Sequence, residues 1–261
     1  MFREASFVCG RYAGAVPPTH IVSLVPSLTE LIAYLGAGDS LVGRTRYCTE
    51  PASIAQRVPA AGGTKDPDIA AIEALKPDLV IANKEENRRE DVEALRARGI
   101  EVLVTEIDSV REAIDGIRQM GDLLERREPA AQLEEEIEAA LLTAQLAQAA
   151  TRVYVGVWHN PMLGLGAATY GQSLIDECGG VNVLGHRERY PELAHGELAA
   201  LSPDFILLPD EPFPFDDGHA RYYGQFAPAR VIDGKLLWWY GPRMPAAIGA
   251  LRAIFREAQN G

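Results

Sequence analysis

Short apolar runs rich in β-branched residues alternate with segments of helical periodicity along nearly the whole chain. This alternation is typical of a parallel sheet whose strands are joined by crossover helices. The expected strands are Ile21–Leu24, Leu41–Gly43, Leu79–Ala82, Glu101–Val104, Val153–Val157, Phe205–Leu208 and Lys235–Trp238. The pattern therefore predicts an α/β fold.

Residues typical of helix N-caps precede three of the segments between these strands. The expected pairs of cap and helix are Ser27 with Leu28–Leu35, Asp68 with Ile69–Leu75, and Asn87 with Arg88–Arg98. Glu30 stands three residues after Ser27, which is the spacing of a capping box. Each pair predicts where a crossover helix begins.

The middle of the chain carries a longer helical pattern. No glycine interrupts residues 125–150, and Leu133, Ile137 and Leu141 recur at helical spacing, so we expect them in the core. A helix from Pro129 to Ala149 would be about 30 Å long. The strand pattern restarts directly after it, so this helix separates two α/β segments.

These segments predict two lobes. We expect an N-terminal α/β lobe over residues 1–124, a backbone helix over 125–150 and a C-terminal α/β lobe over 151–261. The fold class is α/β, with two Rossmann-like lobes that have parallel central sheets and are joined by a single long α-helix. The cleft between two such lobes is the default place for a ligand.

Composition narrows the function classes. Of the 261 residues, 47% are apolar and 24% charged, which is typical of a globular protein. Lys and Arg number 25 against 37 Asp and Glu, a net charge of −12 that would repel a phosphate backbone. We therefore expect no nucleic-acid partner.

The chain shows no pattern typical of a signal peptide or a transmembrane segment. The first eleven residues mix charges of both signs with no apolar run of seven, so they do not form a secretory signal. No stretch has the roughly 18 apolar residues of a transmembrane segment. If this start is native we expect a cytoplasmic protein, and if a signal peptide was lost, a periplasmic or surface one. The three cysteines, Cys9, Cys48 and Cys178, form no disulfide framework, which fits a reducing compartment.

Common catalytic and nucleotide motifs are missing. The chain has no phosphate-binding loop, no His-Glu-x-x-His and no nucleophile elbow, and the glycines at 164, 166 and 171 lack the dinucleotide spacing. The five histidines lie too far apart in sequence for a dense metal cage. His159 and Cys48 stay candidates for single metal ligands. We assign no catalytic residue.

Polar and aromatic side chains concentrate where predicted strands end, which is where open α/β sheets bind ligands. All three tryptophans lie in two of these segments, which indicates either an aromatic platform for a flat ligand or a packing seam between lobes. The candidate ligand-binding residues are Arg44, Arg46, Tyr47, Lys65, Asn83, Lys84, Glu85, Asn87, Trp158, His159, Asn160, Trp239, Tyr240 and Arg243.

Each candidate also has a structural alternative. The arginines would bind an anionic group of the ligand or form exposed salt bridges, for example with Glu50. The charged run from Lys84 to Arg88 would contact ligand or simply solvate the start of a helix. Residues 212–223 form an aromatic loop, either a mobile flap over the cleft or a packed surface loop.

Several segments together carry a family resemblance. They are Ile21–Glu30, Gly43 with Tyr47 and Pro51, Ile72–Val80 and Cys178–Asn182. In this order, around a long helix, they resemble the helical-backbone (class III) substrate-binding proteins of ABC importers for cobalamin, haem and iron-siderophore complexes. The resemblance extends from Ile21 to the C-terminus and is closest to the cobalamin-binding branch.

The resemblance implies a non-catalytic protein with no required cofactor. Its expected ligand is a metal chelate, first a cobalamin or other corrinoid and alternatively haem or an iron-siderophore, and its expected partner is an ABC permease. The positions of Tyr47, Trp158 and Trp239 match aromatic residues that this branch presses on the corrin. Family members also dock on the permease through one acidic residue per lobe, which by position would fall near Ala70 and Glu197.

The sequence differs from the cobalamin-binding branch at several positions, and these differences refine the expected ligand and location. Thr64–Asp66 and Asn83–Glu85 stand where the first lobe of the branch adds aromatic contacts, which favours a ligand with polar, hydrogen-bonding edges. Ala70 is not acidic, although Glu73 lies one helical turn away. The missing signal peptide favours a cytoplasmic member that holds its chelate for a task other than import.

Two other interpretations stay open. One is a cytoplasmic metal-dependent enzyme on the same scaffold, with Glu85 or Glu86 as acid/base and His159 or Cys48 as metal ligand. The other is a regulatory subunit of a cytoplasmic enzyme. The net negative charge of the chain would repel an anionic chelate. Such a ligand could bind only where Arg44, Arg46, Lys84 and Arg243 make the charge around the site positive.

Overall fold

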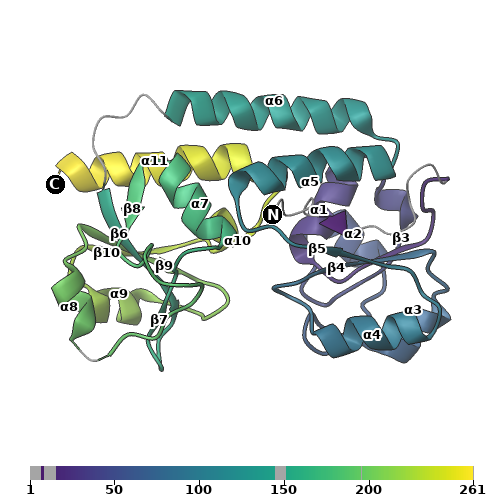
Figure 1. Ribbon diagram of the computed structural model, residues 1–261, viewed down its shortest axis with the longest axis horizontal. Helices are drawn as coiled ribbons and strands as arrows, with labels where there is room; N and C mark the ends of the chain where they lie inside the picture. Colours follow the sequence, from purple (N-terminus) through teal and green to yellow (C-terminus); the bar gives the residue numbers. More distant parts are fainter. Residues whose placement is uncertain (1–6, 9–15, 145–150, 195, 261) are drawn as a thin grey trace, which may run out of the picture. The chain divides into compact units, whose positions relative to one another are not determined.

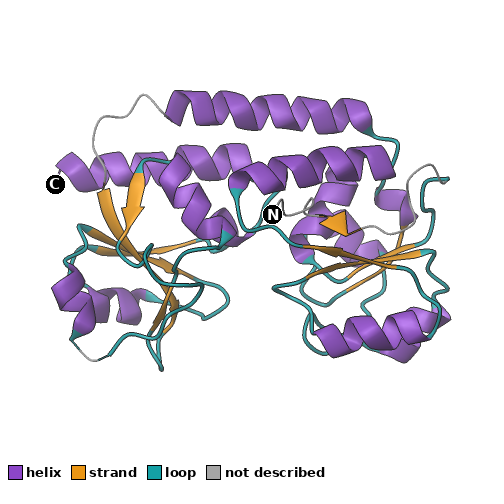
Figure 2. Cartoon of the chain, viewed as in Figure 1, coloured by secondary structure: helices purple, strands orange, loops and turns teal. Residues whose placement is uncertain are grey.

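The structure is a computed structural model that describes residues 7–8, 16–144, 151–194 and 196–260 (Figures 1 and 2). Its internal contacts divide the chain into two compact units. Unit 1 holds the described residues up to Ile107 together with Glu112–Glu135 and Tyr240–Pro242. Unit 2 holds Asp108–Arg111 and the described residues from Glu136 to Trp239 and from Arg243 onward.

Unit 1 is built on a five-stranded sheet of order β1-β5-β4-β2-β3. The strands are β1 (Phe7–Val8), β2 (Ile21–Ser23), β3 (Leu41–Arg44), β4 (Leu79–Asn83) and β5 (Val102–Thr105). All neighbours are parallel except β1, which runs antiparallel to β5. The four strands predicted in this part of the chain are confirmed.

Helices connect these strands. They are α1 (Pro26–Tyr34), the short 3₁₀ helix η1 (Gly38–Ser40), α2 (Ala52–Arg57), α3 (Ile69–Ala74), α4 (Arg89–Ala97) and α5 (Val110–Leu123). Ile72 of α3 and Leu95 of α4 are fully buried in one cluster with Val80 of β4. This apolar cluster fastens α3 and α4 to the sheet. Figure 1 shows the two helices on the same side of that sheet.

Only one of the three predicted N-caps forms. Asp68 accepts a hydrogen bond from the backbone N–H of Ala71 at 2.9 Å and caps α3 as expected. The Ser27 cap is wrong, because α1 begins two residues earlier than predicted, at Pro26, with Val25 as its N-cap. Proline suits that first position since its missing N–H would have no partner there.

The Asn87 cap is also wrong. Arg88 is the N-cap residue of α4, and no side-chain hydrogen bond closes that end. The side chain of Asn87 instead donates to the carbonyl oxygens of Leu24, at 3.3 Å, and Thr64, at 2.9 Å. The side-chain oxygen that a cap would use accepts the backbone N–H of Asn83 at 2.8 Å instead.

Unit 2 has a second five-stranded sheet, of order β10-β9-β6-β7 with β8 also paired to β6. Its strands are β6 (Thr151–Trp158), β7 (Leu163–Gly164), β8 (Gly180–Asn182), β9 (Phe205–Pro209) and β10 (Ala229–Ile232). Only β7 runs antiparallel. The helices are α7 (Tyr170–Glu177), α8 (Glu197–Leu201), α9 (Asp217–Tyr223), α10 (Lys235–Trp238) and α11 (Met244–Asn260).

The predicted strand Lys235–Trp238 is wrong, because these residues form helix α10 and the last strand is β10. The Asp233 carboxylate accepts the backbone N–H of Lys235 at 3.0 Å and closes a turn before the apolar residues. A four-residue apolar run is too short for its periodicity to distinguish strand from helix. The Trp239 segment therefore follows a helix rather than a strand.

The long central helix is confirmed in part. Helix α6 spans Arg127–Ala144, and the remainder of the predicted Pro129–Ala149 helix lies outside the described residues. Leu133, Ile137 and Leu141 are buried, as their spacing predicts. The division between the two units falls inside α6, after Glu135. The lobe boundaries 1–124 and 151–261, and the linking role of 125–150, stay a proposal.

Candidate functional site

The connections of the sheet define a switch point in unit 1. Strand β2 lies between β3 on one side and β4 on the other, so the chain leaves β2 and β4 toward opposite edges of the sheet. In open α/β sheets, ligands bind outside the carboxyl ends of the strands at such a point. Here those ends are followed by Leu24 and Lys84.

A buried hydrogen-bond hub lies at this switch point. The side chain of Asn87 accepts the backbone N–H of Asn83 at 2.8 Å. The Asn83 amide donates to Thr105 Oγ1 at 3.0 Å and to the Tyr240 hydroxyl at 3.2 Å. Its oxygen accepts the backbone N–H of Glu85 at 2.8 Å. The side chains of Asn83 and Asn87 are thus committed to the protein's own loops.

Burial agrees with this structural role. Asn83, Asn87 and Tyr240 are 3%, 7% and 6% exposed. Burial also raises the pKa of the Tyr240 phenol, so this hydroxyl stays protonated. We expected all three side chains to contact ligand, and the structure places them beneath the loops that carry the exposed candidates.

Arg44 is engaged with backbone. Its guanidinium donates to the carbonyl oxygens of Val58 at 2.9 Å, Thr45 at 3.0 Å and Ala55. Arg44 therefore holds the end of α2 against β3.

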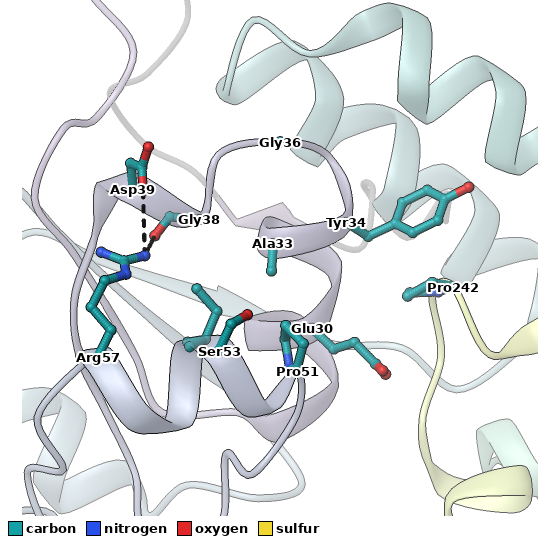
Figure 3. Close-up of a pocket in the computed structure, with 11 residues that line it drawn as sticks. Glu30, Ala33, Tyr34, Gly36, Gly38, Asp39, Pro51, Ser53, Arg57 and Pro242 are labelled. Carbon is teal, nitrogen blue, oxygen red and sulfur yellow. Dashed lines mark hydrogen bonds and ion pairs between the residues drawn. The ribbon is translucent and has the colours of Figure 1, made fainter.

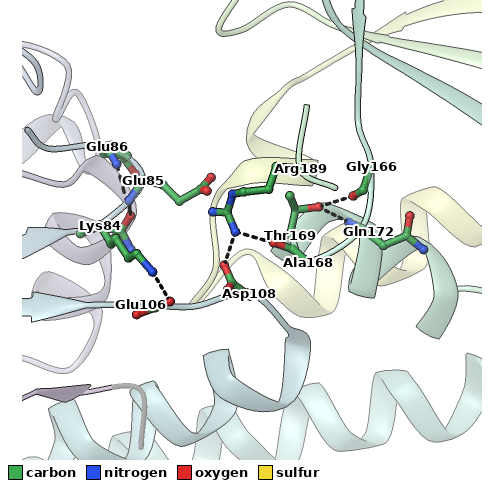
Figure 4. A network of polar contacts seen from close by, with 11 residues as sticks. Lys84, Glu85, Glu86, Glu106, Asp108, Gly166, Ala168, Thr169, Gln172 and Arg189 are labelled. Atoms are coloured by element: carbon green, nitrogen blue, oxygen red, sulfur yellow. Dashed lines mark hydrogen bonds and ion pairs between the residues drawn. The ribbon is translucent and has the colours of Figure 1, made fainter. Parts of the chain in front are cut away.

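Three other cations in unit 1 are paired with groups from neighbouring loops. Arg46 contacts both carboxylate oxygens of Asp66 at 2.8 and 2.7 Å. Lys84, directly after β4, forms an ion pair with Glu106, directly after β5, as Figure 4 shows. Lys65 donates to the backbone carbonyl of Glu85 at 2.7 Å. These pairs are exposed at the carboxyl ends of the strands.

Tyr47 and Cys48 are neighbours with opposite environments. Tyr47 is 52% exposed, and the Arg46 guanidinium lies 5.0 Å from its ring centre. Cys48 is fully buried, with its sulfur 3.1 Å from Thr45 Oγ1. Burial raises the pKa of the Cys48 thiol, which opposes the thiolate that a metal would need.

The exposed aromatic face of unit 2 lies at the carboxyl end of β6. Trp158 ends this strand, and its ring packs edge-on against Phe213 with centroids 5.1 Å apart. The His159 ring contacts His219 at 4.8 Å and Tyr222 at 5.3 Å between centroids. Aromatic side chains from β6, the 212–216 loop and α9 thus gather at one place.

His159 is oriented by a hydrogen bond on one nitrogen. Its Nδ1 lies 3.3 Å from the Tyr223 hydroxyl, and Tyr223 is fully buried. Burial, with a smaller contribution from His219, lowers the pKa of His159 and favours the neutral ring. Such a hydrogen bond is typical of the nitrogen opposite a metal-binding one.

The 212–216 loop packs into the core. Phe215 is 4% exposed, and Phe213 packs against the same buried cluster as Tyr154 and Leu208. Asp216 caps α9 by accepting the backbone N–H of His219 at 3.0 Å. These contacts support the packed-loop alternative over the mobile flap.

The tryptophans do not form one exposed platform. Trp239 is 6% exposed and donates from its indole nitrogen to Glu211 Oε1 at 2.9 Å, whereas Trp158 is 40% exposed. Lys235 and Arg243 each lie over the Trp239 ring, at 5.3 and 5.2 Å from its centre. Packing within unit 2 therefore accounts for Trp239, and Trp158 offers the exposed ring.

The structure also adds residues that sequence reasoning did not select. Asp66 and Glu106 pair with predicted site cations, and Phe213 and Tyr222 complete the aromatic face. Glu106 lies two residues after the predicted strand Glu101–Val104, as Lys84 does after Leu79–Ala82, so the rule that selected Lys84 could have found it. Within the described residues no group of three or more His, Cys, Asp or Glu side chains is arranged to hold a metal ion.

A separate pocket of about 570 Å³ lies in unit 1 beside α1 and α2 (Figure 3). Its lining includes Glu30, Tyr34 and Pro242, with an ion pair between Arg57 and Asp39 at 3.5 Å. None of the predicted ligand-binding residues lines it.

The two acidic positions suggested for docking are both paired. Glu197 forms an ion pair with Arg187, which lowers the pKa of Glu197, and it accepts the backbone N–H of Ala194 at 2.8 Å. Glu73 lies 3.2 Å from Arg98. In the same unit as Glu197, Arg189 donates to Asp108 and to the Ala168 carbonyl (Figure 4).

Comparison with known proteins places this arrangement in a family. The sequence profile of the family described as periplasmic binding protein matches residues 21–217. The chain belongs to the periplasmic binding protein family. This membership confirms the predicted resemblance to helical-backbone substrate-binding proteins and identifies a binding protein rather than an enzyme.

Individual relatives agree with this membership. A vitamin B12-binding protein of Salmonella choleraesuis is 29% identical over 192 residues, which cover 72% of this chain and 71% of that one. The periplasmic vitamin B12 binding protein BtuF of Vibrio cholerae has a TM-score of 0.82 at 22% identity, over 94% and 99% of the two chains. The periplasmic heme-binding protein RhuT from Roseiflexus sp. RS-1 has a TM-score of 0.79 at 25% identity, over 92% and 98%.

These structural matches confirm the predicted fold class of two α/β lobes with parallel sheets. Among the described residues, no helix is both long and apolar enough to cross a membrane.

Proposed function

We propose that this protein binds a corrinoid metal chelate and passes it to an ABC permease. Family membership supports a ligand-binding role, and the relatives named as vitamin B12-binding proteins support the corrinoid. The structural observation that carries the proposal is the exposed aromatic face at the end of β6. A partly exposed Trp158 held by Phe213 suits stacking against a flat macrocycle.

In this proposal the residues of unit 2 supply the apolar contacts. Trp158 stacks on the macrocycle, and His159 stands beside it as a candidate axial ligand through Nε2, because Nδ1 is engaged with Tyr223. Asn160 lies exposed in the same turn and suits hydrogen bonding to a polar edge. Arg243, whose guanidinium lies over the buried Trp239 ring, completes the proposed contacts, and Trp239 supports it from within the fold.

Unit 1 supplies polar contacts in the same proposal. Arg46, Tyr47, Lys65, Lys84 and Glu85 offer donors and acceptors at the strand ends. We assign Arg44, Asn83, Asn87 and Tyr240 a supporting role, since their polar groups already hold these loops in place. Cys48 supports the loop by packing rather than by binding metal.

Ligand binding is the direct test. The purified protein is incubated with cyanocobalamin, cobinamide, haemin and a ferric siderophore, and absorbance, melting temperature and retained colour are recorded. We expect stabilisation and a spectral change with the corrinoids. Absence of any effect with all four compounds would contradict a chelate-binding role, and a response to haemin or siderophore alone would assign the ligand to that alternative class.

Partner and location belong to the same proposal. Import requires a permease and a location outside the cytoplasm, as the family description implies, and Glu197 and Glu73 are the acidic candidates for the permease contact. Fractionation of cells that carry the full-length gene tests this. Recovery in the periplasm or at the surface supports import, whereas recovery in the cytoplasm supports the alternative of chelate binding for another task.

A further inference from the structure

The charges at the strand ends of unit 1 are nearly balanced. We define the polar loop group as residues 44–50, 63–67, 84–87 and 106, which contact one another through Arg46, Lys65 and Asn87. The group holds four cations and five carboxylates, namely Arg44, Arg46, Lys65 and Lys84 with Glu50, Asp66, Glu85, Glu86 and Glu106. The local excess of positive charge that an anionic chelate would require is therefore absent from this group.

Each of these cations already has a partner. Asp66 holds Arg46 through two oxygen contacts, and Glu106 holds Lys84. Lys65 stands next to Asp66 in sequence and donates to a backbone carbonyl, while Arg44 faces three carbonyl oxygens. A carboxylate on a ligand would have to compete with Asp66 or Glu106 for its ion pair.

An uncharged amide faces no such competition. Its oxygen can accept a hydrogen bond from Arg46 or Lys84 while the ion pair stays intact, because a guanidinium and an ammonium each have several donors. Its N–H groups can donate to the carboxylates of the same pairs. A free carboxylate, in contrast, adds a second negative charge to each pair that it approaches, which opposes binding.

We propose that Asp66 and Glu106 are specificity-determining residues. By neutralising Arg46 and Lys84, they make the polar loop group select chelates with uncharged, amide-bearing edges over chelates with free carboxylates. The inference rests on the proposed function, because it concerns the same strand-end residues. It extends that function by assigning the choice between two classes of macrocycle to two carboxylates that act through their cationic partners.

The test compares two ligands that differ in peripheral charge. Dissociation constants for cyanocobalamin, whose edge carries amides, and for haemin, whose edge carries two propionates, are measured with the full chain and with Asp66→Asn, Glu106→Gln and the double variant. Both substitutions keep the side-chain shape, remove the negative charge and replace one acceptor oxygen by an NH2 group. Asp39→Asn is the matched control, because it removes the carboxylate beside Arg57 outside the polar loop group.

The measured quantity is the ratio of the haemin to the cyanocobalamin dissociation constant. We expect each single variant to lower it about threefold, and the double variant about tenfold, which is the size of exposed charge interactions. Raising the salt from about 20 to about 200 mM should shrink the gain, because salt screens exposed charges. The Asp39→Asn control should leave the ratio at the wild-type value.

The outcomes distinguish failure of the proposed function from failure of the role assigned to Asp66 and Glu106. If the wild-type protein binds neither compound, the proposed function fails. If it binds cyanocobalamin, but the ratio stays the same in the double variant or shifts equally in Asp39→Asn, only the assignment to Asp66 and Glu106 is overturned. Haemin binding as tight as cyanocobalamin binding in the wild-type protein also overturns it.

Discussion

Single polar side chains do much of the structural work at the strand ends. Asn83 is the clearest example, because its amide and backbone together contact β5, the loop after β4 and the Tyr240 segment. Buried polar groups of this kind stabilise only while every partner is present. A residue in a binding loop can therefore be essential without touching the ligand.

Replacing Asn83 by alanine tests this at the residue scale. The change removes the amide that donates to the Tyr240 hydroxyl and the oxygen that accepts the N–H groups of Glu85 and Glu86. We expect the free energy of unfolding to fall by about 2–4 kcal/mol, measured by urea denaturation. The exposed Asn160→Ala is the control, with an expected change within about 0.5 kcal/mol. Equal effects of both variants would contradict the hub.

The buried cysteines give a second prediction at this scale. Burial raises the pKa of Cys178 to about 12 and raises that of Cys48, so both thiols stay protonated and shielded at neutral pH. Because the thiolate is the reactive form, neither should react with iodoacetamide at pH 8 in the folded protein, and both should react in urea. Peptide mass mapping measures the modification, and labelling of either thiol without denaturant would show that its site opens.

At the scale of elements, the hydrophobic runs correctly predicted the strands whose type depends on local sequence. The β-branched runs of β2, β4, β6 and β9 are buried central strands, and their type follows from composition alone. The prediction failed at Lys235–Trp238, where one Asp233 carboxylate turns the chain. It also failed at Asn87, whose side-chain oxygen accepts the N–H of Asn83 and whose NH2 group donates to carbonyl oxygens 63 and 23 residues away.

The candidate site shows the same limit. Strand-end positions identified Lys84, Trp158 and His159 as site candidates because the carboxyl ends of parallel strands share one edge of a sheet. The carboxylates that pair with the cations could not be identified in this way, because Asp66 lies 20 residues from Arg46 and Glu106 lies 22 from Lys84. Charge compensation depends on tertiary contacts that no local pattern contains.

The cap of α3 provides a prediction at the element scale. Asp68→Ala removes the acceptor of the Ala71 N–H, and we expect the free energy of unfolding to fall by about 1 kcal/mol. Asp68→Asn, which can still accept that hydrogen bond, should restore most of the loss. Urea denaturation measures both variants. Equal destabilisation by alanine and asparagine would mean that the charge, not the hydrogen bond, stabilises this end.

At the scale of the whole molecule, two tryptophans separate ligand binding from folding. Trp158→Ala should weaken corrinoid binding by about 1–3 kcal/mol, with little change in stability because its ring is partly exposed. Trp239→Ala removes a buried ring and should lower the free energy of unfolding by about 3–5 kcal/mol. Titration calorimetry and urea denaturation on each variant give both values. The opposite pattern would place Trp239, not Trp158, on the ligand.

The Tyr240–Pro242 segment belongs to unit 1 although the chain on both sides of it belongs to unit 2. Neither unit is therefore encoded by one continuous stretch of the gene. A protein shortened after Glu135 would lack the Tyr240 hydroxyl that satisfies Asn83, and would expose to water a side chain that is now buried. Any exchange of one unit between relatives must carry this three-residue segment with the N-terminal half, or repair the contact that it leaves behind.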